Sequence, residues 1–317
     1  MKLIFGALLW AMFLPFAWAT YPQKPIELIV GNAPGGSSDV LARALAKSLE
    51  PILKQPVVVK NIAGAGGTIA IKNTIAAKPD GHTLAIGSIT VLSLAPHCMD
   101  QLPYDTTKDI TPVSMFGYVP NIMAVNNTFS ASDYRSFIAT VKNNPAKFNY
   151  AAQHCTQYWL MGETLKAKNN MDMLFVPVKA MTQARLYVMN NDVQMILESS
   201  LIIPNIKAGQ MRAIAVGSNR RLADLPDVPT FAELNMPEAN IVSWFGVVAP
   251  PGTDPAIVET LNAAIKKATQ DPALISTLQT FAGDVSHMPP REFARHLNNE
   301  WTKYGASVNA TKSKSPN

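Results

Sequence analysis

The 317-residue sequence has few of the features that mark a catalytic or metal centre. It contains only two cysteines, and its five histidines show no pair at metal-ligand spacing. It has no Gly-x-Ser-x-Gly motif, the nucleophile turn of α/β-hydrolases. Its formal net charge is only +5, without a block of Lys and Arg, so nucleic acid is a poor candidate for a partner. We therefore expect a protein that is not an enzyme and that carries no metal or cofactor.

The N-terminus has the three parts of a secretory signal. A positive charge at Lys2 precedes an uncharged apolar run from Leu3 to Trp18, and Ala17-Trp18-Ala19 places small residues at the cleavage positions. The run falls short of the roughly 20 residues of a membrane-spanning helix, and no later segment is apolar enough to cross a bilayer. We predict cleavage after Ala19, where no cysteine can carry a lipid, and export to the periplasm.

The two cysteines, Cys98 and Cys155, would then lie in an oxidising compartment, where one disulfide can form. Their spacing fits no known disulfide scaffold, and they fall in different lobes of the fold predicted below. The sequence favours two separate buried thiols over a disulfide, and the pairing stays open.

Residues 26–44 are the stretch around which the chain is organised. The apolar run Ile26–Val30 is followed by Pro34-Gly35-Gly36-Ser37-Ser38-Asp39 and then by apolar residues at helical spacing, which predicts strand, tight turn and helix. The first amides of a helix have no intrahelical partner and lie at the positive end of its dipole, so this turn suits an anion. The alternative is an ordinary turn with Ser37 or Ser38 as the N-cap.

A second glycine turn, Ala63–Thr68, follows the predicted strand 56–61 and precedes a helix at 69–77. Its Gly64-x-Gly66 start invites a dinucleotide-binding interpretation, but Ile69 stands where that motif needs Gly or Ala, and we reject it. A third strand at 83–87 opens into Ser88-Ile89-Thr90. Three such units in a row predict a parallel sheet, whose ligands bind at the carboxyl ends of the strands.

The pattern then repeats, which predicts a second lobe. Strands are expected at 110–117, 121–126, 148–152, 173–176, 193–197, 211–217 and 242–250, and helices at 133–143, 158–168, 182–189, 202–207, 255–268, 271–281 and 290–308. The tail from Thr311 is polar and expected to be disordered. We assign residues 1–19 to the signal peptide, 20–122 with 249–317 to the first lobe, and 123–248 to the second.

Nine short motifs follow one another from Tyr21 to about Tyr304: Tyr21-Pro-x-Lys-Pro-Ile26, Pro34-Gly-Gly-x-x-Asp39, Asn61-x-x-Gly-Ala-Gly-Gly67, Pro79-Asp-Gly-x-Thr-Leu84, Leu102-Pro-Tyr-Asp105, Ile206-Lys-Ala-Gly209, Leu225-Pro-Asp-Val-Pro-Thr230, Ser243-Trp-Phe-Gly246 and Ala249-Pro-x-Gly-Thr253. Each is weak alone, but their order resembles the extracytoplasmic solute receptors of tripartite tricarboxylate transporters, the Bug family.

The resemblance implies a two-lobe α/β fold of the periplasmic-binding-protein (Venus flytrap) type, with a hinge of two crossing strands. It also implies that first-lobe turns hold a ligand carboxylate through backbone amides and ordered waters. Neither glycine turn contains Lys or Arg, which agrees with binding by amides and dipoles. The first-lobe ligand contacts implied are Pro34, Gly35, Gly36, Ser37, Asp39, Ala65, Gly66, Gly67, Ser88 and Thr90.

The second lobe departs from the family pattern. Residues 150–156 (Tyr-Ala-Ala-Gln-His-Cys-Thr) replace a Ser/Gly-rich loop, 177–180 replace Pro-Tyr-Lys-Gly, and 194–198 replace an acidic pair, while His82 replaces a Tyr in the first lobe. We expect these changes to select a different distal end of the ligand. The second-lobe contacts expected are Gln153, His154, Thr156 and Lys179, although Lys179 can equally be a solvated surface residue.

Three individual residues have competing interpretations. Asp39 either stabilises the helix N-terminus or orients the anion-binding turn. His154 beside Cys155 suggests a nucleophile and its base, but sequence neighbours rarely have the required geometry and no third orienting group is evident. Trp244 is expected to pack at the hinge rather than to stack on a ligand.

These observations predict a monomeric periplasmic receptor that captures a small organic carboxylate between its lobes and delivers it to the permease subunits of a tripartite tricarboxylate transporter. A ligand-sensing partner of a membrane signalling kinase is the alternative, since both roles use the same clamshell. A periplasmic hydrolase is disfavoured because the nucleophile constellation is missing.

Overall fold

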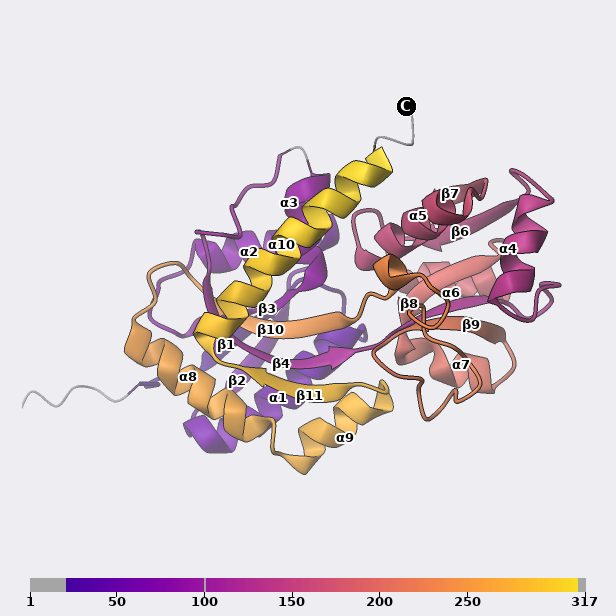
Figure 1. The fold of residues 1–317 in the computed structure, drawn as a ribbon. Helices are drawn as coiled ribbons and strands as arrows, with labels where there is room; N and C mark the ends of the chain where they lie inside the picture. The colour runs from indigo at the N-terminus through magenta and orange to yellow at the C-terminus, as the bar shows by residue number, and fades with distance from the viewer. Residues whose placement is uncertain (1–20, 100, 313–317) are drawn as a thin grey trace, which may run out of the picture.

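The computed structural model of the chain describes residues 21–99 and 101–312 (Figure 1). The predicted signal peptide, 1–19, and the last part of the predicted polar tail, 313–317, lie outside the described residues. Within them the chain forms two β-sheets with helices packed on their faces. This is the two-lobed α/β fold that the sequence predicts. Among the described helices, none has both the length and the hydropathy that a bilayer crossing requires.

The first sheet has the strand order β11-β4-β10-β3-β1-β2. Its parallel part, β2-β1-β3, is mostly apolar because helices cover both faces, and β10 and β4 extend it in antiparallel pairing. Its strands are β1 (Ile26–Val30), β2 (Val57–Asn61), β3 (Thr83–Ser88), β4 (Thr111–Val119), β10 (Ser243–Ala249) and β11 (Asp284–Met288). Its helices are α1 (Ser37–Leu53), α2 (Thr68–Ile75), α8 (Pro255–Ala268), α9 (Pro272–Thr280) and α10 (Pro290–Lys312).

Alternation along β1 explains the two layers of the first lobe. Ile26, Leu28 and Val30 pack into one core with α1 and α8, while Ile29 faces the opposite core with α2. The long helix α10 crosses over the lobe on this second side and reaches α5 of the other lobe (Figure 1).

The second sheet has the strand order β7-β6-β8-β5-β9. Strand β6 is parallel to β7 and β8, while β5 is antiparallel to β8 and β9. Its strands are β5 (Asn121–Asn126), β6 (Phe148–Ala152), β7 (Met173–Pro177), β8 (Met195–Ser199) and β9 (Met211–Gly217), and its helices are α4 (Tyr134–Lys142), α5 (Gln157–Asn169), α6 (Met181–Met189) and α7 (Ile203–Lys207). Tyr150 packs on the α4 and α5 side, and Ala151 on the α6 and α7 side.

Short elements complete the fold: η1 (Ala65–Gly67), η2 (Ile89–Leu94), α3 (Ala95–Cys98), η3 (Ser200–Ile202) and η4 (Pro237–Ala239). The sequence did not predict η2, α3 or the edge strand β11. All five residues of β11 are only partly buried, so this strand lacks the apolar alternation by which a strand is recognised.

The chain passes between the sheets twice, from β4 to β5 at Pro120 and through residues 218–242 into β10. Strand β10 pairs with β3 and β4 from Ser243 onward, so the return to the first sheet begins before residue 249. The predicted lobe limits, 20–122 with 249–317 and 123–248, stay a prediction.

The expectation of two separate thiols is wrong, because Cys98 and Cys155 form a disulfide with their Cα atoms 5.7 Å apart. Cys98 ends α3, which follows β3, and Cys155 lies in the turn after β6. The cysteines do belong to different lobes, as predicted from the sequence. However, the carboxyl ends of β3 and β6 face the same junction between the lobes. Sequence separation therefore said nothing about their distance in space.

Candidate functional site

A cavity of about 660 Å³ lies between the two lobes, at the carboxyl ends of β1, β2 and β3 on one side and of β6, β7 and β8 on the other. The first-lobe wall consists of turns rich in Gly, Ala and Ser: Gly31–Pro34, Gly36–Ser38, Ala63–Gly67 and Ser88–Thr90, with Met99 at its edge. The second-lobe wall consists of larger and more polar side chains: Gln153, His154, Thr156–Tyr158, Val178–Thr182, Arg185, Glu198 and Leu201. Ser243, Trp244 and Phe245 of β10 also line it.

The turn after β1 presents the N-terminus of α1 to this cavity. Gly36 is the N-cap residue and makes no side-chain cap, while Gly36, Ser37 and Ser38 line the cavity. Gly35 has φ +85°, a conformation that glycine adopts without strain, and it does not line the cavity. The free first-turn amides and the helix dipole therefore make this part of the wall electropositive without a cationic side chain.

Asp39 shapes this turn from behind. Its Oδ2 accepts a hydrogen bond from the Gly35 amide at 2.9 Å, and its Oδ1 accepts one from the Asn61 side chain at 2.9 Å and pairs with Arg43 at 2.9 Å. Burial alone would raise the pKa of Asp39, but the hydrogen bonds from Arg43, Gly35 and Asn61 hold it below its ordinary value. Asp39 does not line the cavity, so these contacts favour the orienting role among its two interpretations.

The second glycine turn brings its backbone close to the first. Four consecutive residues, Gly64 to Gly67, have positive φ values of 142°, 46°, 66° and 99°. A Cβ at Gly31 would lie 2.6 Å from the Gly67 Cα, so only glycine lets the turns after β1 and β2 touch. A Cβ at Gly66 would meet nothing within 4 Å, and Gly66 lines the cavity. This turn therefore offers bare backbone to a ligand.

A chain of polar side chains runs from the third turn through the hinge. Thr90 Oγ1 donates to Gln157 Oε1 at 2.6 Å, and Gln157 Nε2 donates to Ser243 Oγ at 2.9 Å. Ser243 Oγ in turn donates to Asn121 Oδ1 at 2.9 Å, and Asn121 Nδ2 donates to the Ile241 carbonyl at 2.8 Å. This series of hydrogen bonds connects the two lobes with the two segments that cross between the sheets, at Asn121 and at Ser243. It therefore ties the cavity wall to the hinge.

The turn after β6 forms the opposite wall. Thr156 is the N-cap of α5 and also donates to the Gln153 carbonyl at 2.7 Å, which closes the turn. Gln153 Nε2 donates to the Lys179 carbonyl at 2.9 Å and so ties this turn to the one after β7. The His154 ring packs against Trp159 with ring centroids 5.0 Å apart. Cys155 is in the disulfide, so it offers no thiol nucleophile beside His154.

Arg185 and Glu198 form an ion pair on the same wall. Arg185 Nη2 donates to Glu198 Oε1 at 2.8 Å and Nε donates to Oε2 at 3.1 Å, with the Glu198 side chain only 3% exposed. Burial raises the pKa of Glu198 to about 7, although the Arg185 charge opposes the shift. The Lys, Arg and Glu residues that line the cavity are Lys179, Arg185 and Glu198, and all three belong to the second lobe.

The cavity gathers most of the residues that the sequence singled out. Those that line it are Pro34, Gly36, Ser37, Ala65, Gly66, Gly67, Ser88, Thr90, Gln153, His154, Thr156 and Lys179; Gly35 and Asp39 do not. Trp244 lines the cavity but mainly packs on α10, with its Nε1 donating to Glu300 at 3.2 Å and its ring against Phe293.

The sequence did not predict that Gln157, Tyr158, Arg185 and Ser243 line the cavity, nor the role of Glu198. Glu198 alone had a usable signal, because it is a carboxylate at the carboxyl end of an otherwise apolar strand.

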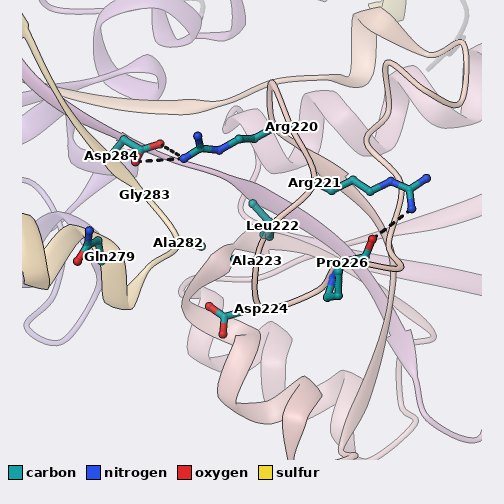
Figure 2. Close-up of a pocket in the computed structure, with 10 residues that line it drawn as sticks. All are labelled: Arg220, Arg221, Leu222, Ala223, Asp224, Pro226, Gln279, Ala282, Gly283 and Asp284. Carbon is teal, nitrogen blue, oxygen red and sulfur yellow. Dashed lines mark hydrogen bonds and ion pairs between the residues drawn. The ribbon is translucent and has the colours of Figure 1, made fainter.

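A second cavity, of about 510 Å³, lies between residues 220–226, which follow β9 of the second sheet, and residues 279–284, at the end of α9 and the start of β11 of the first (Figure 2). Its arginines are already engaged: Arg220 points toward Asp284 at 3.1 Å, and Arg221 donates to the Pro226 carbonyl at 3.2 Å (Figure 2). The Arg220 side chain is 77% exposed, so solvent screens its charge. The N-terminus of α1 and the glycine turns after β1 and β2 line the first cavity and not this one, so the cavity at the strand carboxyl ends is the candidate site. Within the described ranges, no cluster of three metal-ligating side chains occurs.

Two α/β lobes on a double hinge, with a polar cavity at the facing strand ends, define a solute-binding receptor. The profile of the family described as "Tripartite tricarboxylate transporter family receptor" matches residues 41–312. The protein BugT of Bordetella pertussis is 36% identical over 264 residues, which cover 82% of this chain and 81% of BugT. The chain therefore belongs to the tripartite tricarboxylate transporter receptor family, also called the Bug family.

Two solved structures of Rhodopseudomonas palustris proteins hold ligands. MatC with bound malate is 26% identical to this chain and superposes with a TM-score of 0.84. The match covers 91% of this chain and 100% of MatC. A second protein, with adipate, is 25% identical to this chain and superposes with a TM-score of 0.87. The match covers 92% of this chain and 99% of that protein. Both ligands are small dicarboxylates.

Proposed function

We propose that the chain is a periplasmic receptor that binds a small organic carboxylate in the interlobe cavity by closure of its lobes. The observation that carries the proposal is the asymmetry of the cavity wall. Its first-lobe side offers helix and turn amides without a charged side chain, and its second-lobe side carries Lys179, Arg185 and Glu198. A carboxylate placed against the amides gains hydrogen bonds and the helix dipole, and no lysine or arginine is needed there.

Closure follows from the double hinge. The first-lobe turns receive the carboxylate, and the second lobe then packs its turn after β6 over the distal end. The ligand stabilises the closed state because it contacts both walls only in that state. The malate and adipate of the related proteins support a carboxylate as the ligand class.

The distal end of the ligand is the part that this chain selects differently. Gln153, His154 and Thr156 line the cavity opposite the glycine turns, and the Gln153 amide is held by the Lys179 carbonyl. We assign ligand contact to the twelve predicted residues that line the cavity, and to Arg185 and Glu198. Gly35 and Asp39 act on the turn rather than on the ligand. Delivery of the ligand by the monomeric receptor to a tripartite permease, without catalysis, completes the proposal.

Mass spectrometry of the ligand released from gently purified protein tests this function. The identified compound should contain a carboxylate and should stabilise the ligand-free protein in a thermal-shift assay. At 100 times its dissociation constant the stabilisation is about 2.7 kcal/mol, which raises the melting temperature by a few degrees. Malate, adipate, an amino acid and a monocarboxylate form the comparison panel. A protein that responds to no carboxylate would contradict the proposal.

A further inference from the structure

The Cys98–Cys155 disulfide joins the two walls of the interlobe cavity. Cys98 is the last residue of α3 in the first lobe, and Cys155 lies in the turn between β6 and α5 of the second lobe. The residues next to each cysteine line the cavity: Met99 on one side, His154 and Thr156 on the other. The cross-link therefore connects the end of α3 to the turn after β6, beside the cavity and from opposite lobes.

The lobes also contact each other non-covalently, through hydrogen bonds and through an ion pair between Arg220 and Asp284 at 3.1 Å. Ser37 Oγ and Ser199 Oγ lie 3.0 Å apart, Thr90 donates to Gln157, and the Ser200 hydroxyl donates to the Phe281 carbonyl. Each of these hydrogen bonds can be exchanged for bonds to water when the lobes separate. A disulfide cannot, because its Cα atoms stay within about 7 Å of one another. Within the described residues, the lobes are joined covalently by the two backbone crossings and by the Cys98–Cys155 disulfide.

We propose that Cys98–Cys155 is a redox latch that limits how far the cavity opens and thereby sets the rate and affinity of ligand exchange. In the oxidised protein, the end of α3 and the turn after β6 move together, so the lobes can rotate only slightly about the hinge. In the reduced protein, the lobes are held by the backbone crossings and by exchangeable contacts, and wider opening is allowed.

The latch changes ligand affinity through the closed-state population. A ligand that binds the closed state has an apparent dissociation constant equal to the intrinsic one divided by the closed fraction. If reduction lowers the closed fraction to a tenth, the dissociation constant rises roughly tenfold. Thermodynamic reciprocity requires that bound ligand make the disulfide harder to reduce by the same factor. The effect of the disulfide on ligand affinity rests on the proposed function, whereas its effect on the opening of the lobes does not.

The chemistry of the switch is ordinary thiol–disulfide exchange. Cys155 is only 3% exposed, whereas Cys98 is half-buried, so an external thiolate reaches the Cys98 sulfur. Attack there forms a mixed disulfide and releases the Cys155 thiolate, which takes up a proton. With dithiothreitol, its second thiol then releases Cys98 and closes a cyclic disulfide. Two electrons and two protons have passed from the reagent to the protein.

The ligand-free test is small-angle X-ray scattering of the mature protein before and after dithiothreitol, with thiols counted in denaturant. We expect no free thiol and a smaller radius of gyration before reduction, then two thiols and a larger radius afterwards. The double variant C98S/C155S should have the larger radius under both conditions, and circular dichroism checks its folding. Two free thiols in the untreated protein, or an unchanged radius after reduction, would overturn the latch.

The ligand test uses the compound identified by mass spectrometry, or malate and adipate as probes. Reduction should raise the dissociation constant and the dissociation rate of the wild type and leave those of C98S/C155S unchanged. Equal constants in both redox states would show that the latch does not control exchange. If no carboxylate binds but the radius still grows on reduction, the proposed function fails while the restriction of opening stands.

Discussion

Arg185 holds Glu198 through two hydrogen bonds, of 2.8 and 3.1 Å, on the second-lobe wall of the cavity. The carboxylate ends an apolar strand, and its side chain is 3% exposed. Both residues line the cavity, so a ligand there meets a paired charge and not an isolated one. Burial raises the pKa of Glu198 to about 7, which makes the pair a pH-sensitive part of the second-lobe wall.

The free energy of unfolding should depend on pH through Glu198. Burial raises the pKa of Glu198 from 4.5 to about 7 in the folded protein, so between these values the folded state binds more protons than the unfolded state. This group's contribution to stability is therefore complete below pH 4.5 and is lost as the pH rises toward 7. The loss amounts to about 3 kcal/mol at most.

Urea titrations of wild type and E198Q at several pH values measure this dependence. The difference in unfolding free energy between the two proteins should change steadily between pH 4.5 and 7 and level off outside that window. A difference that is flat across the window would mean that Arg185 keeps Glu198 ionised throughout.

Substitution of Gly66 by alanine should weaken ligand binding more than it weakens the fold. Gly66 has φ +66°, and an added Cβ meets nothing in the protein, so the methyl group would stand in the cavity. The conformational strain of the change is about 1 kcal/mol. Gly209 is a matched control, since it has φ +71°, equally open surroundings and no place in the cavity wall.

We expect G66A and G209A to lower the melting temperature alike, but only G66A to raise the dissociation constant, by roughly tenfold for about 1.4 kcal/mol of lost contact. Isothermal titration with the identified ligand measures the dissociation constants of the two variants. Equal affinities in the two variants would place the carboxylate away from the second glycine turn.

Replacement of Asp39 by asparagine should disturb the first turn without a direct loss of ligand contact. Asp39 accepts hydrogen bonds from Gly35 and Asn61 and pairs with Arg43, and its depressed pKa means that its stabilisation is lost only as the pH falls through the folded value. D39N should destabilise the protein by about 1–2 kcal/mol at neutral pH and weaken binding through the displaced turn.

The control is D254N. Asp254 is likewise an acid at a helix N-terminus, where it caps α8 far from the cavity wall, and asparagine caps nearly as well. Calorimetry and titration should show reduced affinity for D39N alone. If D39N keeps wild-type affinity, the hydrogen bond to Gly35 does not position the anion-binding turn.

The sequence signals for the first-lobe wall are local, which is why they could be interpreted. Glycines at Gly64, Gly66 and Gly67 indicate a turn with positive φ, and the helix N-terminus after Pro34 indicates free amides. Both features need only a few consecutive residues. Strand β6 and helix α8 were likewise predicted with their observed limits, because apolar periodicity and caps lie within each segment.

The missed features depend on residues that are distant in sequence. Arg185 and Glu198 belong to different elements, and Gln157 meets Ser243 only because the hinge brings α5 to β10. Strand β11 has no apolar alternation and forms by pairing with β4. The disulfide was misjudged for the same reason, since 57 residues and a lobe boundary separate its cysteines. Tertiary packing decides each of these contacts.

The disulfide should also stabilise the protein globally, apart from its effect on the cavity. It closes a loop with a sequence separation of 57, and the chain entropy that such a cross-link removes from the unfolded state corresponds to about 4 kcal/mol. Urea unfolding with and without dithiothreitol should therefore shift the wild-type midpoint downward on reduction. C98S/C155S should unfold at the same midpoint under both conditions. A wild-type midpoint that does not respond to the reductant, although two thiols are detected, would mean that the lobes unfold separately and that the loop entropy is not lost in a single transition.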